Sequence, residues 1–102
     1  MKILIVDDNQ VNLFVIEKIL KRAGYDDFTS LASAQEMYDY LEIDGPTKES
    51  SVDIILLDIM MPDIDGITAC RKLQSIPHLK DIPVIFVTAL EDSNKVAEAL
   101  DV

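Results

Sequence analysis

The chain has 102 residues, of which 49% are hydrophobic, and this length and composition are typical of one small globular domain. Its 19 acidic and 9 basic residues give a formal net charge of -10, which repels phosphate backbones and anionic lipid headgroups. Direct nucleic-acid binding is therefore not expected. The apolar run at the N-terminus is too short to span a bilayer, and the single cysteine, Cys70, cannot form an internal disulfide. We expect a cytoplasmic protein without membrane anchoring.

The first half of the chain predicts two strands, each followed by a helix. Residues 2–6 (KILIV) form an apolar, β-branched run typical of a strand covered on both faces. Residues 9–23 have the three- and four-residue spacing of an amphipathic helix, which Gly24 would end. The residues that carry this spacing are Val11, Phe14, Val15, Ile19, Leu20 and Ala23.

A weaker strand is predicted at residues 27–31 (DFTSL). Ser33 and Glu36 then match the capping-box pattern that begins many helices. The helix that follows is expected to bury three residues, namely Met37, Tyr40 and Leu41. Residues 42–51 are polar and predict a solvated loop.

The second half of the chain repeats the alternation of strand and helix. The runs 53–57 (DIILL) and 83–87 (PVIFV) predict buried strands, and residues 92–100 predict a fourth helix. Between the two strands, Asp65 begins a helix with apolar positions at Ile67, Cys70 and Leu73. With right-handed crossovers, this order predicts an open α/β fold with helices on both faces of a parallel sheet.

Acidic side chains follow two of the predicted strands. Asp7 and Asp8 come directly after the first strand and Asp58 follows the third, while Thr88 follows the fourth. In open α/β sheets, ligands bind outside the carboxyl ends of the strands, so these side chains should converge. Each acid taken alone is best explained as a helix cap. Three carboxylates in one crevice, however, repel by roughly several kcal/mol at an effective dielectric constant of about 20. Either a retained proton or a cation must balance them.

The ligand atoms favour a magnesium ion. All of the available ligands are hard oxygens, and Mg²⁺ typically uses one or two carboxylates and shares its remaining positions with water and a phosphate. We expect Mg²⁺ to bind Asp58 and either Asp7 or Asp8, with the main-chain carbonyl of Met60 added. A carboxylate beside this ion can attack a phosphoryl group in line, which makes Asp58 the candidate nucleophile. Thr88 would donate a hydrogen bond; without the acids, a strand residue or a helix cap would be the preferred explanation, but its position level with Asp58 favours the hydroxyl role.

Three segments together resemble the receiver domain of two-component response regulators. They are ILIVDD (3–8), IILLDIMMPDIDG (54–66) and PVIFVTA (83–89). The resemblance covers residues 1–102 and implies a flavodoxin-like doubly wound parallel sheet with strand order 2-1-3-4. Receivers continue into a fifth strand, which ends in a lysine and proline, and then a fifth helix. This sequence stops at Val102, so we expect a receiver domain that is truncated at its C-terminus.

The resemblance also implies the roles of individual residues. Asp58 would accept a phosphoryl group from a phosphohistidine on a sensor histidine kinase or phosphotransferase. Asp7, Asp8, Asp58 and the Met60 carbonyl would bind Mg²⁺. Thr88 would be the switch hydroxyl, and the backbone amide of Ala89 would contact phosphate. Such a domain is a signalling switch rather than an enzyme, and its partners would include its own output domain or another receiver.

Two alternatives remain open. Without the family's lysine, the chain could be a receiver-fold interaction module that no longer accepts phosphate. The second and less favoured alternative is an aspartyl-nucleophile phosphatase of the haloacid dehalogenase type. Its acids follow strand one as D-x-D, whereas Asp7 and Asp8 are adjacent.

Two further expectations concern the edge of the predicted sheet and the residues that follow its strands. Without a fifth strand, residues 83–87 would leave an apolar edge, which predicts a homodimer, strand exchange or a partner that covers the edge. Met60 and Leu90, two positions beyond Asp58 and Thr88, are apolar and cannot orient a hydrolytic water. We therefore expect slow loss of phosphate.

Overall fold

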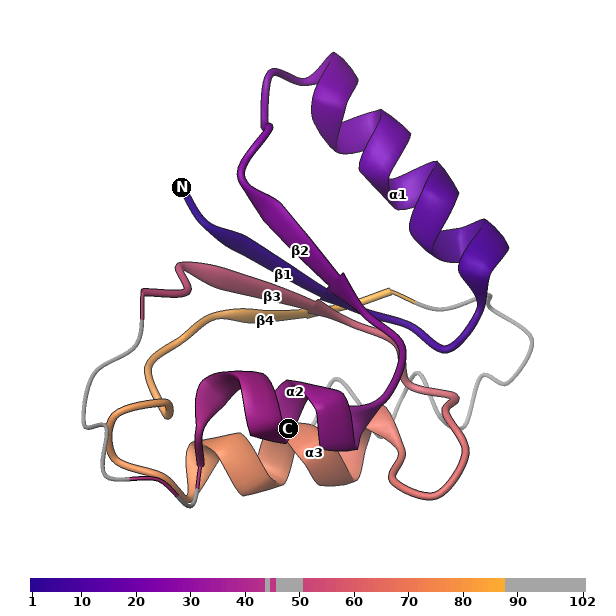
Figure 1. The fold of residues 1–102 in the computed structure, drawn as a ribbon. Helices are drawn as coiled ribbons and strands as arrows, with labels where there is room; N and C mark the ends of the chain where they lie inside the picture. The colour runs from indigo at the N-terminus through magenta and orange to yellow at the C-terminus, as the bar shows by residue number, and fades with distance from the viewer. Residues whose placement is uncertain (44, 46–50, 88–102) are drawn as a thin grey trace.

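A four-stranded parallel sheet lies at the centre of the protein, with helix α1 on one face and helices α2 and α3 on the other (Figure 1). The computed structural model describes residues 1–43, 45 and 51–87, so the predicted fourth helix lies outside the described residues. The strand order is β2-β1-β3-β4, as predicted, and each neighbouring pair is parallel. The elements are β1 (Ile3–Val6), α1 (Gln10–Arg22), β2 (Phe28–Leu31), α2 (Ala34–Leu41), β3 (Ile54–Leu57), α3 (Gly66–Gln74) and β4 (Val84–Phe86).

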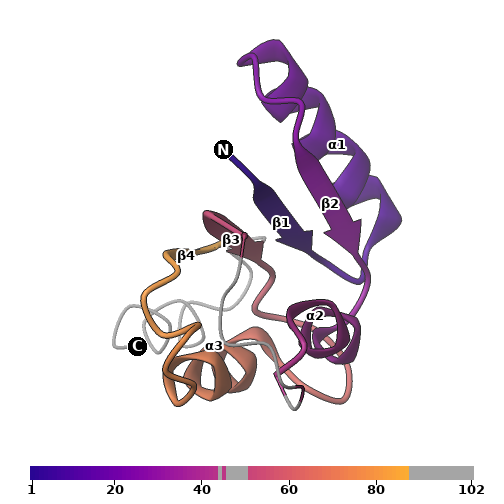
Figure 2. The ribbon, with the colours of Figure 1, turned by 60° about the vertical axis from the view of Figure 1, so that its left-hand side comes forward.

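Successive strand residues point to opposite faces, and this alternation divides the core into two layers. Figure 2 shows the helices that cover these faces, α1 on one side of the sheet and α2 and α3 on the other. On the α2 and α3 side, Leu4 and Val6 pack with Met37 from α2 and Leu73 from α3. On the α1 side, the buried residues are Ile3, Ile5 and Leu13. All four residues of β1 are buried, which explains their uninterrupted apolar sequence.

The register of the sheet aligns the carboxyl ends of its strands. Val6 at the end of β1 pairs with Leu31 of β2 and with Leu57 of β3. Leu57 in turn pairs with Phe86 of β4. The residues that follow β1 and β3 therefore leave the sheet at the same edge.

The predicted helix starts are present. The Asn9 side chain accepts hydrogen bonds at the start of α1, and the Asp65 side chain accepts one from the Thr68 amide at the start of α3. The Ser33 hydroxyl accepts from the Glu36 amide (3.1 Å). The Glu36 carboxylate accepts from the Ser33 hydroxyl and from the Ala32 amide, so the predicted capping box forms with its return bond one residue earlier than usual.

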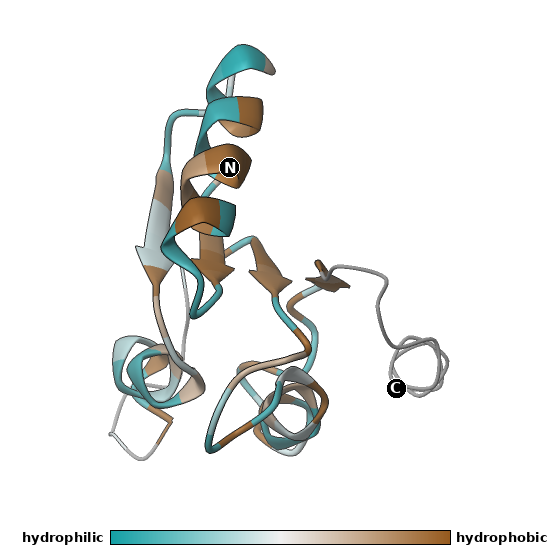
Figure 3. Ribbon diagram, turned by 90° about the vertical axis from the view of Figure 1, so that its right-hand side faces the viewer, coloured by the Kyte–Doolittle hydropathy of each residue, from teal (hydrophilic) through white to brown (hydrophobic). Residues whose placement is uncertain are grey.

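Helix α1 buries a different stripe from the predicted one, and only Leu20 belongs to both. Leu13, Ile16 and Leu20 pack against the sheet, whereas most of the predicted apolar residues lie outside this contact. Their exposed fractions are 70% for Val11, 57% for Phe14, 48% for Val15 and 60% for Ile19, and Ala23 is exposed as well. The reason is that a helix packed on a sheet buries only the residues on the side that contacts the sheet. The residues with apolar spacing outside that stripe have no helix beside them among the described residues. In Figure 3, α1 accordingly carries hydrophobic and hydrophilic segments side by side.

One aromatic side chain also differs from expectation. Tyr40, predicted to be buried by α2, is 37% exposed, and the Lys2 ammonium lies 5.7 Å from its ring centroid. Tyr38 instead packs against the core. In the chain's second half, His78 has a buried Nε2 with no hydrogen-bond partner in the described part of the chain. The fully buried neighbour Leu79 holds this loop against the protein.

Strand β4 lies at the edge of the described sheet and pairs with β3. Its central residue, Ile85, is 49% exposed. No helix among the described residues is long and apolar enough to cross a membrane.

Candidate functional site

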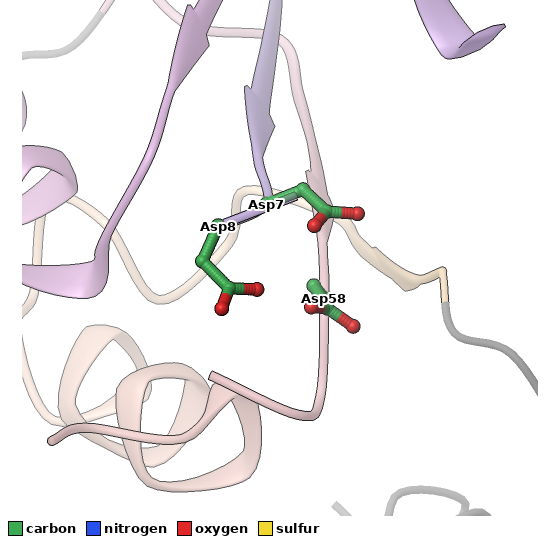
Figure 4. A group of neighbouring side chains, drawn as sticks. All are labelled: Asp7, Asp8 and Asp58. Atoms are coloured by element: carbon green, nitrogen blue, oxygen red, sulfur yellow. The ribbon is translucent and has the colours of Figure 1, made fainter. Parts of the chain in front are cut away.

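Three carboxylates meet at the edge of the sheet where β1 and β3 end. Asp7, Asp8 and Asp58 each offer a carboxylate oxygen that lies within 4.8 Å of the other two (Figure 4). The register explains this meeting, because the Asp58 amide donates a hydrogen bond to the carbonyl of Val6 (2.9 Å). The structure therefore brings together the three acids that the sequence predicted to converge.

Asp7 is the most deeply buried member of the cluster, with an exposed fraction of 1%. Its Oδ1 accepts a hydrogen bond from the Asn9 amide (2.8 Å), which fixes the carboxylate at the start of α1. Its Oδ2 is buried and has no hydrogen-bond partner among the residues that the structure describes. A buried carboxylate oxygen without a partner is costly, and a cation would compensate it.

Asp58 is also buried, with an exposed fraction of 6%. Its Oδ1 accepts a hydrogen bond from the Met60 amide at 3.3 Å. Burial of the carboxyl and the charge of Asp7 raise the pKa of Asp58 from 3.8 to about 7, with smaller contributions from Asp8. The Met60 amide opposes this rise in pKa because it stabilises the ionised form.

The donor set suits a hard divalent ion. The three acids supply only carboxylate oxygens, and the exposed Asp8 leaves one side of the cluster open to solvent. A small ion that keeps several waters can bind such a half-open site, which is the preference of Mg²⁺. Without an ion, the raised pKa of Asp58 shows that a proton is the alternative means of reducing the charge.

The remaining predicted site residues divide into two groups. Met60 lies in the loop directly after Asp58, with its side chain 51% exposed and its backbone in contact with the Asp58 carboxylate. Thr88, Ala89 and Leu90 lie outside the described residues, so their predicted roles have no structural description here.

Sequence reasoning missed one residue of this region. Gly66, the first residue of α3, is buried and contacts the backbone of Asp58 and Ile59. The signal in the sequence was a glycine directly after the capping residue Asp65, at a position where glycine is a poor helix former. Such a glycine indicates a close approach of two backbones.

Comparisons with known proteins agree with this geometry. The family model of the response regulator receiver domain matches residues 3–102. The chain is similar to the response regulator PleD of Caulobacter vibrioides, with 39% identity over 95 residues, which cover 88% of this chain and 18% of PleD. It is also similar to the chemotaxis protein CheY1 of Helicobacter pylori, with 30% identity over 100 residues, covering 98% of this chain and 77% of CheY1. The chain thus spans less than a fifth of PleD.

Solved structures show the same likeness. The receiver domain of a signal transduction histidine kinase from Syntrophus aciditrophicus has a TM-score of 0.80 and 32% identity, covering 98% of this chain and 70% of that chain. A receiver domain of a sensor histidine kinase from Pseudomonas aeruginosa, solved with a magnesium ion coordinated in its active site cleft, has a TM-score of 0.79 and 29% identity. That match covers 98% of this chain and 76% of the other. Family model, relatives and fold agree, and the chain belongs to the response regulator receiver domain family.

Proposed function

We propose that this chain is the phosphoacceptor domain of a two-component response regulator and that Asp58 carries the phosphoryl group. The observation that supports this function is the meeting of three carboxylates, one of them with a pKa raised to about 7, at the edge of the sheet. Asp58 is assigned as the acceptor because its carboxylate meets those of both other acids and contacts the half-exposed loop residue Met60. The domain would act as a switch and not as an enzyme with turnover.

Asp7, Asp8, Asp58 and the Met60 carbonyl would hold Mg²⁺, as proposed from the donor set and from the magnesium-bound Pseudomonas aeruginosa relative. When bound, the ion supplies positive charge that favours ionised Asp58 and offsets the charge of the phosphoryl oxygens. An oxygen of Asp58 attacks phosphorus in line, and the phosphorus–nitrogen bond of the phosphohistidine breaks. The electron pair of that bond leaves with the imidazole, which then takes a proton. Thr88 and Ala89 remain the predicted switch hydroxyl and phosphate-binding amide.

A phosphorylation assay tests the proposal. The chain is incubated with a small phosphoryl donor such as acetyl phosphate in the presence and absence of Mg²⁺, and the adduct is detected by intact-mass spectrometry. We expect one added phosphoryl group that requires Mg²⁺, is lost in Asp58→Asn and is kept in Asp63→Asn, which removes an exposed acid from the same loop. If the chain forms no adduct and does not respond to beryllofluoride, the remaining interpretation is an interaction module that does not accept phosphate. Turnover of a phosphate ester that depends on Asp7 but not on Asp58 would identify the phosphatase.

The exposed stripe of α1 suggests where a phosphoryl donor binds. Helix α1 begins at Gln10, directly after Asp7 and Asp8, so a protein that covers the stripe reaches the acidic site as well. Val11 and Ile19 are the most exposed hydrophobic residues of this stripe, and Val11 lies in the first turn of α1, nearest the acids. We propose that a histidine kinase or phosphotransferase contacts this stripe. Val11→Ser should slow phosphorylation by the protein donor and leave phosphorylation by acetyl phosphate unchanged, and equal slowing of both would contradict this assignment.

The edge of β4 supports a second proposal about partners. The described sheet ends at β4, whose half-exposed Ile85 lies in a strand that pairs on one side with β3. We propose that a second copy, an exchanged strand or a partner pairs with this edge. Sedimentation of the chain and of Ile85→Lys tests it, because the charge should shift a dimer towards monomer. A parent chain that is monomeric at high concentration would remove the homodimer and strand-exchange forms.

A cytoplasmic location remains a prediction of the sequence.

A further inference from the structure

The loop after β3 closes on itself through a contact between two backbones. The Gly66 amide donates a hydrogen bond to the carbonyl of Ile59 (2.9 Å), which joins the first residue of α3 to the second residue after the strand. Met60 lies within this closed loop, and Asp58 directly precedes it, with its carboxylate accepting a hydrogen bond from the Met60 amide. The position of both groups therefore depends on how closely the start of α3 approaches the end of β3.

This approach leaves no room for a side chain at position 66. A Cβ on Gly66 would lie 2.9 Å from the carbonyl carbon of Asp58 and 2.9 Å from the Cα of Ile59, and it would overlap the carbonyl oxygen of Asp58. All three atoms belong to the backbone, so no side-chain rotation can relieve the clash. The φ angle of Gly66 is not positive, so the need for glycine here comes from space alone.

We propose that Gly66 is a positioning residue of the acidic site, and that its missing side chain sets the place of the Asp58 carboxylate and the Met60 carbonyl. This inference rests on the proposed function, since it assigns Gly66 a part in binding Mg²⁺ and phosphate. Gly66 itself touches neither the ion nor the phosphoryl group. It acts through the peptide unit between Asp58 and Ile59.

The surroundings indicate that a methyl group at position 66 would displace the loop more than the elements beside it. Helix α3 is anchored in the core by Ile67, Cys70 and Leu73, and β3 is held by hydrogen bonds on both sides. In the loop between them Ile59 is buried against Ile67, whereas Met60 is half-exposed, so the loop can move towards solvent at Met60. To regain ordinary contact distance, the carbonyl oxygen of Asp58 must move by more than about 1 Å. Mg²⁺ requires nearly ideal octahedral geometry, and a displacement of about that size is enough to impair a preorganised site.

The test compares Gly66→Ala with the parent chain by Mg²⁺ titration, followed by NMR or calorimetry at a temperature where circular dichroism shows both to be folded. We expect Mg²⁺ to bind at least about tenfold more weakly to Gly66→Ala. Leu73→Ala is the matched control, because it creates a cavity in the same helix about two turns beyond Gly66. It should lower the melting temperature without changing the affinity for Mg²⁺.

The outcomes separate this inference from the proposed function. A parent chain that binds no Mg²⁺ and accepts no phosphoryl group would overturn the proposed function and this inference with it. A parent that binds Mg²⁺ and a folded Gly66→Ala with equal affinity would overturn the inference alone. If Gly66→Ala is unfolded in buffer, trimethylamine oxide is added to restore folding, and the titration is repeated beside the parent in the same solution. A variant that stays unfolded even then shows that Gly66 serves the fold and not the site, which also overturns the inference.

Discussion

Replacing Asp58 by Asn should stabilise the protein above neutral pH in the absence of metal. The folded protein holds the pKa of Asp58 at about 7, whereas the ordinary value is 3.8. The folded state therefore binds a proton that the unfolded state releases, over the whole interval between these two values. In that interval the free energy of unfolding falls as the pH rises, because the unfolded state binds fewer protons.

The size of the effect follows from the same two values. A difference of about three pKa units corresponds to roughly 4 kcal/mol over the full interval, at about 1.4 kcal/mol per unit. About 2–3 kcal/mol of it lies above about pH 5, and water that reaches the open side of the cluster reduces this figure. Asn cannot ionise, and its amide can donate to the neighbouring carboxylates. The free energy of unfolding of the variant should therefore not fall in this way as the pH rises.

Urea denaturation with a chelator present, at about pH 5 and about pH 8, measures the effect. The stability advantage of Asp58→Asn over the parent should grow by about 2 kcal/mol between the two conditions. Asp81→Asn is the control for removing one negative charge from an acidic chain, because Asp81 is exposed and precedes β4 at the opposite end of the sheet. An advantage that does not change with pH, or that Asp81→Asn reproduces, would refute the assignment of a raised pKa to Asp58.

Three further predictions concern the site and the fold. Affinity for Mg²⁺ should fall by up to about tenfold per pH unit below about pH 7, since the ion competes with the proton on Asp58, and a flat titration profile would contradict this. Ser33→Ala should cost about 1 kcal/mol of stability by removing the cap of α2, measured by urea denaturation against Gln35→Ala, which leaves the cap intact. Met60→Asn should shorten the lifetime of the phosphorylated chain, because an amide can orient the attacking water, and an unchanged or longer lifetime would speak against it.

Several features of this protein could be predicted from local patterns. The continuous apolar runs at β1 and β3 identify strands covered on both faces, and acids directly after them must lie at one edge once the strands are parallel. The caps at Asn9, Ser33 and Asp65 could likewise be predicted, because each acts on amides within its own turn. These features depend on neighbours in the sequence or on the direction of a strand.

Other features depended on contacts between distant segments, and for these the sequence alone was insufficient. Spacing showed that Val11, Phe14 and Leu20 belong to an amphipathic helix, but only the packing of α1 on the sheet decided that Leu20 contacts the core and Phe14 does not. Asp7 and Asp8 are equivalent in the sequence, yet the bond to the Asn9 amide and burial make Asp7 the enclosed acid. A periodic pattern defines which residues share a face, whereas the burial of that face depends on what the rest of the chain places against it.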